Sequence, residues 1–282
     1  MLLFLREKGK APVRTFPIQA PPPPSGRGFS FAARLWAVAF AASMVLGACV
    51  APGSIPQTTT TPEEAWPRQL LDDEGTAVSI AAPPQRIVSL TPATTELIFA
   101  LGAGARTVGR GDFDDYPPEA VALPGVAAFT GVEHEALVAL EPDLVLAGGN
   151  NFTAAADVTR MRDLDIPVLV LYAASFDGVI DDIELVGRAI GADEEADALT
   201  YDMRLRQDEV ARAVAGLPRP RVFYQIGSQP EIYGPAPGSF VADMVNLAGG
   251  EPITTGDAAV FAMPLERLVD EDPEVIVLGD AQ

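Results

Sequence analysis

The chain carries one segment twice: EALVALEPDLVL at residues 135–146 and ERLVDEDPEVIV at residues 266–277, 131 positions later. Each copy has the pattern of a short helix, a proline that stops it and a buried strand. Two further pairs support the repeat: RIV at 86–88 with RVF at 221–223, and LGAG at 101–104 with LAGG at 247–250. A long-range repeat of this kind predicts two lobes of similar plan.

Strand and helix patterns alternate around the first copy. Strands are expected within 69–80, where Asp73-Glu74-Gly75 separates two short runs, and at 86–90, 106–109, 143–147 and 168–171. Helices are expected after Thr91, which can cap a helix with Pro92 in its first turn and Gly102 at its end, and at 135–140 and 154–164. This alternation predicts an α/β lobe with a largely parallel sheet over residues 69–175.

The pattern changes to helix alone over residues 177–216. Two helical stretches meet near Gly191, and the second, residues 193–215, would extend about 35 Å at 1.5 Å per residue. Strand character returns at 221–226. We therefore expect a helical connector at 176–217, a second α/β lobe at 218–282, and a cleft between the lobes suited to a ligand.

Composition limits the classes of function. The formal charge is -20, and after residue 48 every basic residue is an arginine. Acids outnumber these arginines by 38 to 13, and no basic stripe with interleaved aromatics is present, so nucleic-acid binding is not expected. The hydrophobic content of 48% excludes disorder of the whole chain.

The N-terminal part has the features of an export signal. Arg27 and Arg34 precede the apolar run 35–46, which is too short to span a bilayer, and the run ends in LGAC at 46–49, similar to a bacterial lipobox. We expect residues 1–48 to be a signal peptide with an atypical N-terminal extension, and Cys49 to carry a lipid. Residues 49–68, with threonines at 58–61, would form a flexible tether. The expected location is the periplasm or the outer face of the cytoplasmic membrane.

Three separate motifs, in this order, resemble one family. PQRIVSLTPATTE at 84–96, DYPPEA at 115–120 and LVALEPDLV at 137–145 look like the iron-siderophore and vitamin B12 class of periplasmic substrate-binding proteins of ABC importers. The DYPP motif is most similar to the cobalamin-binding members. The resemblance implies two Rossmann-like lobes joined by one long interlobe helix, with small hinge motion when the ligand binds.

The same resemblance implies partners and contact residues. One glutamate on each lobe, here Glu135 and Glu266, would dock into arginine pockets of a permease dimer; the alternative is an acid favoured near a helix N-terminus. The ligand would be a metal chelate such as cobalamin, bound by a monomer without a cofactor. Because relatives continue beyond the strand at 275–278, the second lobe is expected to be incomplete.

Aromatic side chains are the expected ligand contacts, because relatives line the cleft with rings that lie against a flat chelate. The candidates are Thr91, Phe113, Tyr116, Phe129 and Asn150 on the first lobe and Tyr233, Phe240 and Phe261 on the second. Core packing is the alternative for each aromatic ring. Trp66 falls in or near the tether, and Arg110 is the obvious basic candidate.

Other functions stay open at this point. A ferric siderophore or haem could occupy the same type of receptor, and an extracellular hydrolase with a pair of carboxylates is a remote possibility. No Gly-x-Ser-x-Gly motif is present, and the single histidine, His134, cannot build a multi-histidine metal site. We expect no catalytic or metal site and interpret His134 as a surface residue.

Overall fold

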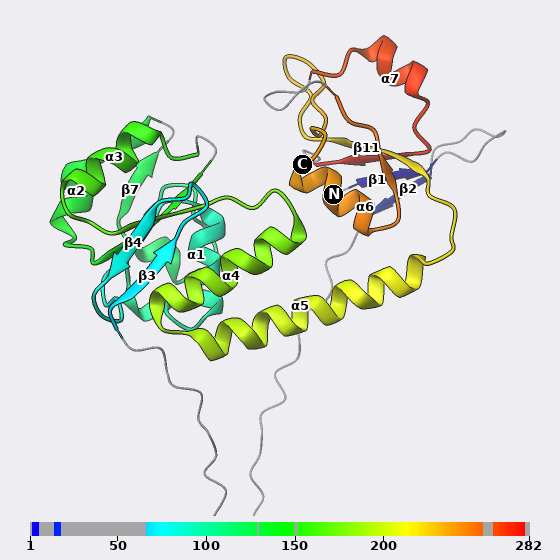
Figure 1. The fold of residues 1–282 in the computed structure, drawn as a ribbon. Coiled ribbons are helices and arrows are strands. Elements are labelled where there is room, and N and C mark those ends of the chain that lie inside the picture. The colour runs from blue at the N-terminus through cyan, green and yellow to red at the C-terminus, as the bar shows by residue number, and fades with distance from the viewer. Residues whose placement is uncertain are drawn as a thin grey trace, which may run out of the picture. The chain divides into compact units, whose positions relative to one another are not determined.

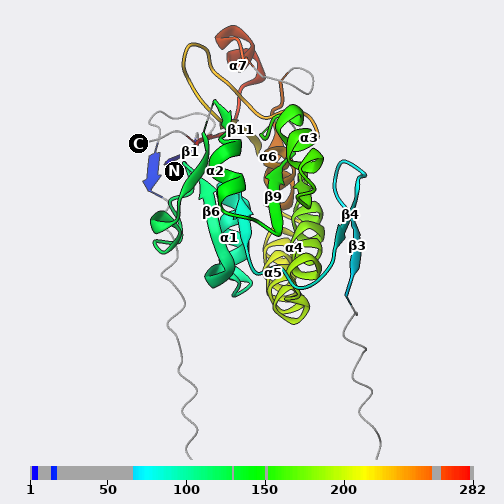
Figure 2. The ribbon, with the colours of Figure 1, turned by 90° about the vertical axis from the view of Figure 1, so that its left-hand side faces the viewer.

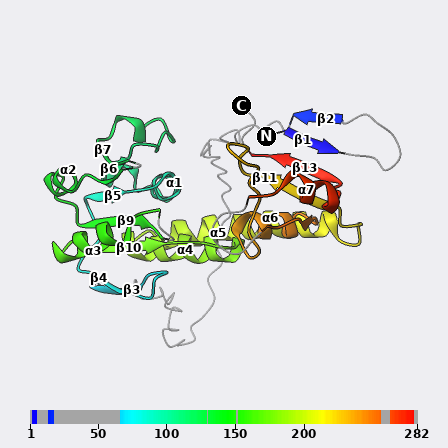
Figure 3. The ribbon, with the colours of Figure 1, turned by 90° about the horizontal axis from the view of Figure 1, so that it is seen from above.

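The computed structural model describes residues 2–5, 14–17, 66–128, 130–149, 152–255 and 262–279. Its first sheet has six strands in the order β10-β9-β5-β6-β7-β8, parallel except for the antiparallel pair β7–β8 (Figure 3). The strands are β5 (Ile87–Ser89), β6 (Thr107–Gly111), β7 (Gly125–Ala128), β8 (Gly131–Val132), β9 (Leu144–Gly148) and β10 (Val168–Leu171). The predicted α/β class with a mainly parallel sheet is confirmed.

Helices cover both faces of this sheet. Alternate side chains of the strands, such as Ile87 and Val88, enter two separate cores. One core contains residues of α1 (Pro92–Ala100) and α4 (Phe176–Ile190), and the other contains residues of α2 (His134–Ala139) and α3 (Ala155–Asp163). Burial on both faces explains why β9 and β10 are apolar at every position, as their fully buried runs LVLAG and VLVL show.

The hairpin formed by β3 (Arg68–Leu71) and β4 (Ala77–Ile80) lies to the side of β9 (Figure 2), where β10 forms the edge of the six-stranded sheet. Its turn bonds to that edge: the amide of Asp73 donates to the carbonyl of Val170 (3.1 Å), and the amide of Tyr172 donates to Asp73 Oδ2. Arg162 Nη2 also donates to the buried Asp72 carboxylate (2.6 Å). The turn thus forms hydrogen bonds with backbone groups of the β10 edge that an open edge strand would leave exposed.

The two helices expected at 177–216 are present as α4 and α5 (Asp193–Val214) (Figure 1). Gly191 ends α4 in the left-handed conformation, with φ +70°, which glycine adopts without strain. Of the 22 residues of α5, only Ala196 and Thr200 are buried. α5 stands between the two sheets in the sequence, as predicted for the connector.

The second sheet contains β11 (Arg221–Gln225), β12 (Glu251–Pro252) and β13 (Val275–Leu278), which are parallel in the order β12-β11-β13. Strands β1 (Leu2–Leu5) and β2 (Arg14–Pro17) extend it next to β13 (Figure 3), although the sequence assigns both to the export signal. The lobe also contains α6 (Phe240–Leu247) and α7 (Leu265–Glu271). Within the described residues, its buried core cluster consists of Phe223, Ile253 and Met263.

Candidate functional site

The repeated segment folds into the same short unit in both lobes. In the first lobe Arg86, just before β5, donates to the carbonyl of Leu140 through Nε (2.8 Å) and Nη2 (2.6 Å). In the second lobe Arg221, at the start of β11, donates through Nη1 to the carbonyl of Glu271. Leu140 and Glu271 stand at the C-terminal ends of α2 and α7, where the carbonyl groups favour a cation. Each short helix is therefore fastened to a parallel strand of its own lobe.

In each lobe an acidic residue also bonds to the backbone of the same arginine. Asp143 Oδ1 accepts from the amide of Arg86 (2.8 Å), and Glu274 Oε1 accepts from the amide of Arg221 (3.4 Å). In return, the amides of these two acids donate to the carbonyls of the same arginines, at 3.0 and 2.9 Å. Two segments 131 residues apart thus make the same set of bonds, which confirms the predicted repeat in three dimensions.

The turn that follows each helix is also the same. Glu141 and Asp272 have φ of +45° and +39°, a region that residues other than glycine seldom adopt. Each is followed by a proline, Pro142 or Pro273, which cannot continue the helix. The chain therefore leaves both helices in the same way, and the arginine bonds hold a turn that is unfavourable by itself.

The predicted docking glutamates occupy equivalent positions in this unit. Glu135 is the second residue of α2 and Glu266 the second residue of α7. Both side chains are exposed, and within the described residues neither carboxylate makes a hydrogen bond or ion pair. Each is free to pair with a cationic group of another molecule, and each also lies where a helix N-terminus favours an acid.

His134 is not the surface residue that the sequence suggested. Its side chain is only 12% exposed, and Nε2 lies 2.8 Å from Asp157 Oδ1 on α3. Asp157 Oδ2 also accepts from the amide of Val132 (3.3 Å). The histidine, which precedes Glu135 in the chain, thus joins the start of α2 to α3. Among the described residues, no group of three or more His, Cys, Asp or Glu side chains could hold a metal ion.

Three of the predicted ligand contacts of the first lobe follow the carboxyl ends of neighbouring strands. Thr91 follows β5, while Phe113 and Tyr116 follow β6, and both rings are exposed. The Thr91 hydroxyl caps α1 by accepting from the amide of Thr94 (3.3 Å). In parallel sheets the carboxyl edge is the usual place for a ligand, and exposed rings there can stack on a flat molecule.

Two aromatic residues that the sequence did not select follow the next strands. Phe152, 78% exposed, comes four residues after β9, and Tyr172 directly follows β10 and is also exposed. Because β5, β6, β9 and β10 are parallel members of one sheet, all four rings belong to the loops of one edge. An aromatic residue within four positions of the end of β9 and of β10 was the signal in the sequence that could have identified them.

The buried carboxylate of Asp114 shapes the loop that carries Phe113 and Tyr116. Asp114 is 1% exposed, and its Oδ2 accepts from Thr95 Oγ1 (2.6 Å) and from the amide of Gly111 (2.9 Å). Burial raises the pKa of Asp114, and the hydrogen bond from Thr95 and then that from Gly111 oppose the rise. The structure makes this residue a buried link between α1 and β6.

Arg110 and Trp66 are engaged within the first lobe. Arg110 Nη1 donates to the carbonyl of Gly111 (2.6 Å). The guanidinium carbon of Arg68 lies 4.7 Å from the ring centre of Trp66, which packs against the core. Trp66 therefore belongs to the folded lobe rather than to the tether, and β3 already begins at Arg68.

In the second lobe, Tyr233 and Phe240 lie in the part of the chain that follows β11. Tyr233 is partly buried, and its amide donates to the carbonyl of Gly227 (2.9 Å). Phe240 begins α6 behind the capping residue Ser239 and is exposed. The structure supports a surface role for Phe240 more than for Tyr233. Cys49, Phe129, Asn150 and Phe261 lie outside the described residues.

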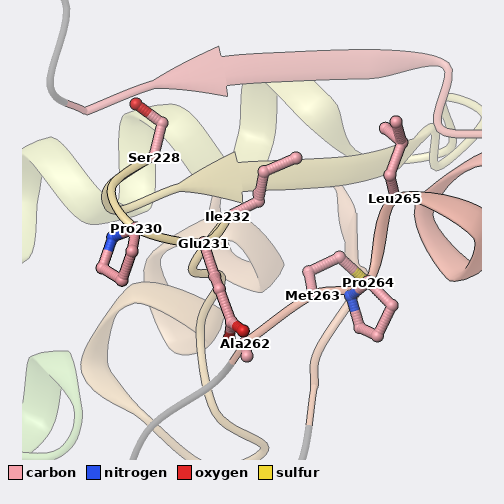
Figure 4. Close-up of a pocket in the computed structure, with 8 residues that line it drawn as sticks. All are labelled: Ser228, Pro230, Glu231, Ile232, Ala262, Met263, Pro264 and Leu265. Carbon is pink, nitrogen blue, oxygen red and sulfur yellow. The ribbon is translucent and has the colours of Figure 1, made fainter.

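A pocket of about 320 Å³ lies in the second lobe (Figure 4). Two loops form it, one after β11 and one before α7, with Ser228, Pro230, Glu231, Ile232, Ala262, Met263, Pro264 and Leu265 as lining residues. Its size suits a small group rather than a whole chelate. No sequence pattern marked it, because two loops 30 residues apart create it.

The search for membrane spans covered the described helices. None of them combines the length and the apolar character that crossing a bilayer requires.

Comparison with known proteins gives the class of the chain. It is 30% identical over 254 residues to an uncharacterized ABC transporter substrate-binding lipoprotein of Bacillus subtilis, covering 88% of this chain and 81% of that protein. It is 35% identical over 218 residues to a cobalamin-binding protein of Halobacterium salinarum, covering 74% of this chain and 57% of the relative. These relatives are binding proteins rather than enzymes.

Solved structures agree on the fold. The periplasmic vitamin B12 binding protein BtuF of Vibrio cholerae aligns with a TM-score of 0.64 and 26% identity, over 70% of this chain and 76% of that chain. A periplasmic heme binding protein of Pseudomonas aeruginosa aligns with a TM-score of 0.61 and 23% identity, over 69% and 71%. The sequence profile described as periplasmic binding protein matches residues 87–281. The chain therefore belongs to the periplasmic binding protein family.

Proposed function

We propose that this chain is the substrate-binding lipoprotein of an ABC importer, which captures a corrinoid of the vitamin B12 type between its two lobes and delivers it to the permease. The observation that carries the proposal is the duplicated unit that presents an exposed glutamate from each lobe. Two equivalent carboxylates suit a permease dimer, since each could pair with arginine on one subunit.

The proposed ligand is a corrinoid because two relatives are named for cobalamin or vitamin B12 and because exposed rings follow three parallel strands of the first lobe, β6, β9 and β10. A large flat chelate would stack on such rings. Thr91, Phe113, Tyr116, Phe129, Asn150, Tyr233, Phe240 and Phe261 remain the proposed contacts, with Phe152 and Tyr172 added from the structure. The protein would act as a monomer, without catalysis and without a cofactor.

Haem is the second candidate ligand, and the structural similarity to a heme binding protein favours it. A ferric siderophore would use the same type of receptor. Export and lipid attachment at Cys49 would keep the protein in the periplasm or on the outer face of the cytoplasmic membrane, next to the permease.

Two measurements test the proposal. Titration of the purified chain with cobalamin, cobinamide, ferric siderophores and haem should show the tightest binding for a corrinoid, and Phe152→Ala should weaken it about tenfold. A preference for haem would change the ligand, and binding of none of the four would contradict the receptor function.

The docking part is tested separately by Glu135→Lys with Glu266→Lys. We expect uptake of the ligand to fall at least 100-fold, because each new lysine faces a cationic pocket, while the affinity for the ligand stays unchanged. Uptake that stays intact would rule out docking through these glutamates.

A further inference from the structure

Each of the two docking helices exposes a valine one turn after its glutamate. Val138 on α2 is 44% exposed and Val269 on α7 is 68% exposed. They are equivalent positions of the repeat, 131 residues apart, and each follows its glutamate by three residues. Residues three apart share a face of a helix, so a carboxylate and an apolar side chain are neighbours on both helices.

Both valines leave a large part of the side chain uncovered by the lobe that carries them. The inward positions of the helices are filled by Leu137, which is fully buried in its core, and by Leu268, which packs against the core of the second lobe. Val138 and Val269 belong to neither core. Valine is also a poorer helix former than alanine or leucine. A single exposed valine needs no explanation, but the same exposed valine beside both glutamates points to a shared use.

We infer that each docking surface has two parts: a carboxylate that pairs with an arginine of the permease, and a valine that packs on apolar permease surface beside that arginine. The inference rests on the proposed function and extends it from Glu135 and Glu266 to Val138 and Val269. The partner is the permease because the valines continue the faces that carry the two carboxylates. A dry apolar neighbour keeps water away from an ion pair and so strengthens it.

The test measures the affinity of the full chain, with and without cobalamin, for the permease of the importer in lipid nanodiscs. Val138→Thr and Val269→Thr keep the β-branched shape and replace one methyl group with a hydroxyl. Each single variant should weaken permease binding about fourfold, because that is the change in affinity that corresponds to burying one methylene group. The double variant should weaken binding about 16-fold. Val210→Thr is the matched control, because Val210 is 45% exposed on α5, and it should leave the affinity unchanged.

Salt dependence separates this role from a general loss of fold. In Val138→Thr the Glu135 ion pair would be wetter, so the affinity should fall more steeply between 50 and 300 mM salt, on the order of twofold further than in the parent chain. The variant should keep its melting temperature. Threonine variants that bind like the parent chain, or a Val210 variant that weakens as much, would overturn the inference.

The outcome also distinguishes the inference from the function on which it rests. If the lysine variants at Glu135 and Glu266 lose the permease and the threonine variants do not, docking stands and the apolar part is wrong. If the lysine variants still bind the permease, the proposed docking itself is wrong, and the valines lose their assigned partner.

Discussion

The two lobes contain the same helix–turn–strand unit, and within the described residues the cores that the two copies pack against differ in extent. In the first lobe α2 packs into a core shared by six strands and α3, whereas in the second α7 packs against a cluster built on three buried residues. The arginine, acid and left-handed turn are nevertheless the same in both. Local bonds between a strand start and a helix end therefore determine the unit, and the size of the core determines how firmly it is anchored.

The largest difference between the lobes is expected for the equivalent leucines Leu137 and Leu268. Leu137→Ala removes a fully buried side chain and should lower the free energy of unfolding by about 3 kcal/mol. Leu268→Ala removes a partly buried one and should cost about half as much. Urea unfolding followed by circular dichroism measures both. Equal costs would show that the second core is as well packed as the first.

The arginines should differ in the opposite direction. Arg221→Gln loses a carbonyl bond and an ion pair with Glu271 and should cost about 1–2 kcal/mol, while Arg86→Gln, whose residue is more exposed, should cost about 0.5–1 kcal/mol. Arg106→Gln is the control in the first lobe, since Arg106 Nη1 donates to the carbonyls of Pro84 and Ile190 away from α2. Permease binding should be measured for Arg221→Gln, Arg86→Gln and Arg106→Gln. If it weakens equally in all three, the arginine bonds that hold α7 and α2 act only on stability.

The smallest effect is expected from the carboxyl pair of Asp73 and Asp182 in the first lobe. Burial, and then the hydrogen bond and charge of Asp73, raises the pKa of Asp182 on α4 to about 8. Unfolded, the same carboxyl loses its proton near pH 4, so its contribution to stability is complete below that pH and decreases until about pH 8.

Asp182→Asn removes this dependence and keeps a hydrogen-bond donor for Asp73. The melting temperature of the variant should exceed that of the parent chain by about 2 °C at pH 8 and be similar at pH 4, since solvent screens the partly exposed pair. Thermal melts at the two pH values provide the measurement. A variant that is less stable at pH 8 would contradict the raised pKa.

Much of the fold was predictable because its signals are local. Thr91 caps α1, Gly191 ends α4, and the repeat predicted α7 from the pattern of α2. Strand β8 was missed because two residues carry no periodicity and depend on β7 for pairing. Helix α6 was also missed, although Ser239 at its start and Gly249 after its end are ordinary helix signals.

The candidate site residues also fall into two groups: some have a local signal in the sequence, and others do not. The sequence placed Glu135 and Glu266 at equivalent helix positions, and it selected Tyr116 from the DYPP motif and Phe113 as an aromatic ring. It gave no information about the burial of Asp114, the pairing of His134 with Asp157, or the pocket between the loops after β11 and before α7. These features join residues that are close in space but not in the sequence, so no local pattern encodes them.

The amino-acid sequence by itself determined that the chain has two related α/β parts, that a long helix separates them in the sequence, and that an acid begins each repeated helix. Caps, breaks and periodicity act over a few residues, and they can be read without a structure. Only the tertiary structure decided which side chains are exposed at the carboxyl ends of the strands and which arginine holds which helix. Burial and hydrogen bonding between distant segments exist only after the strands have been placed side by side.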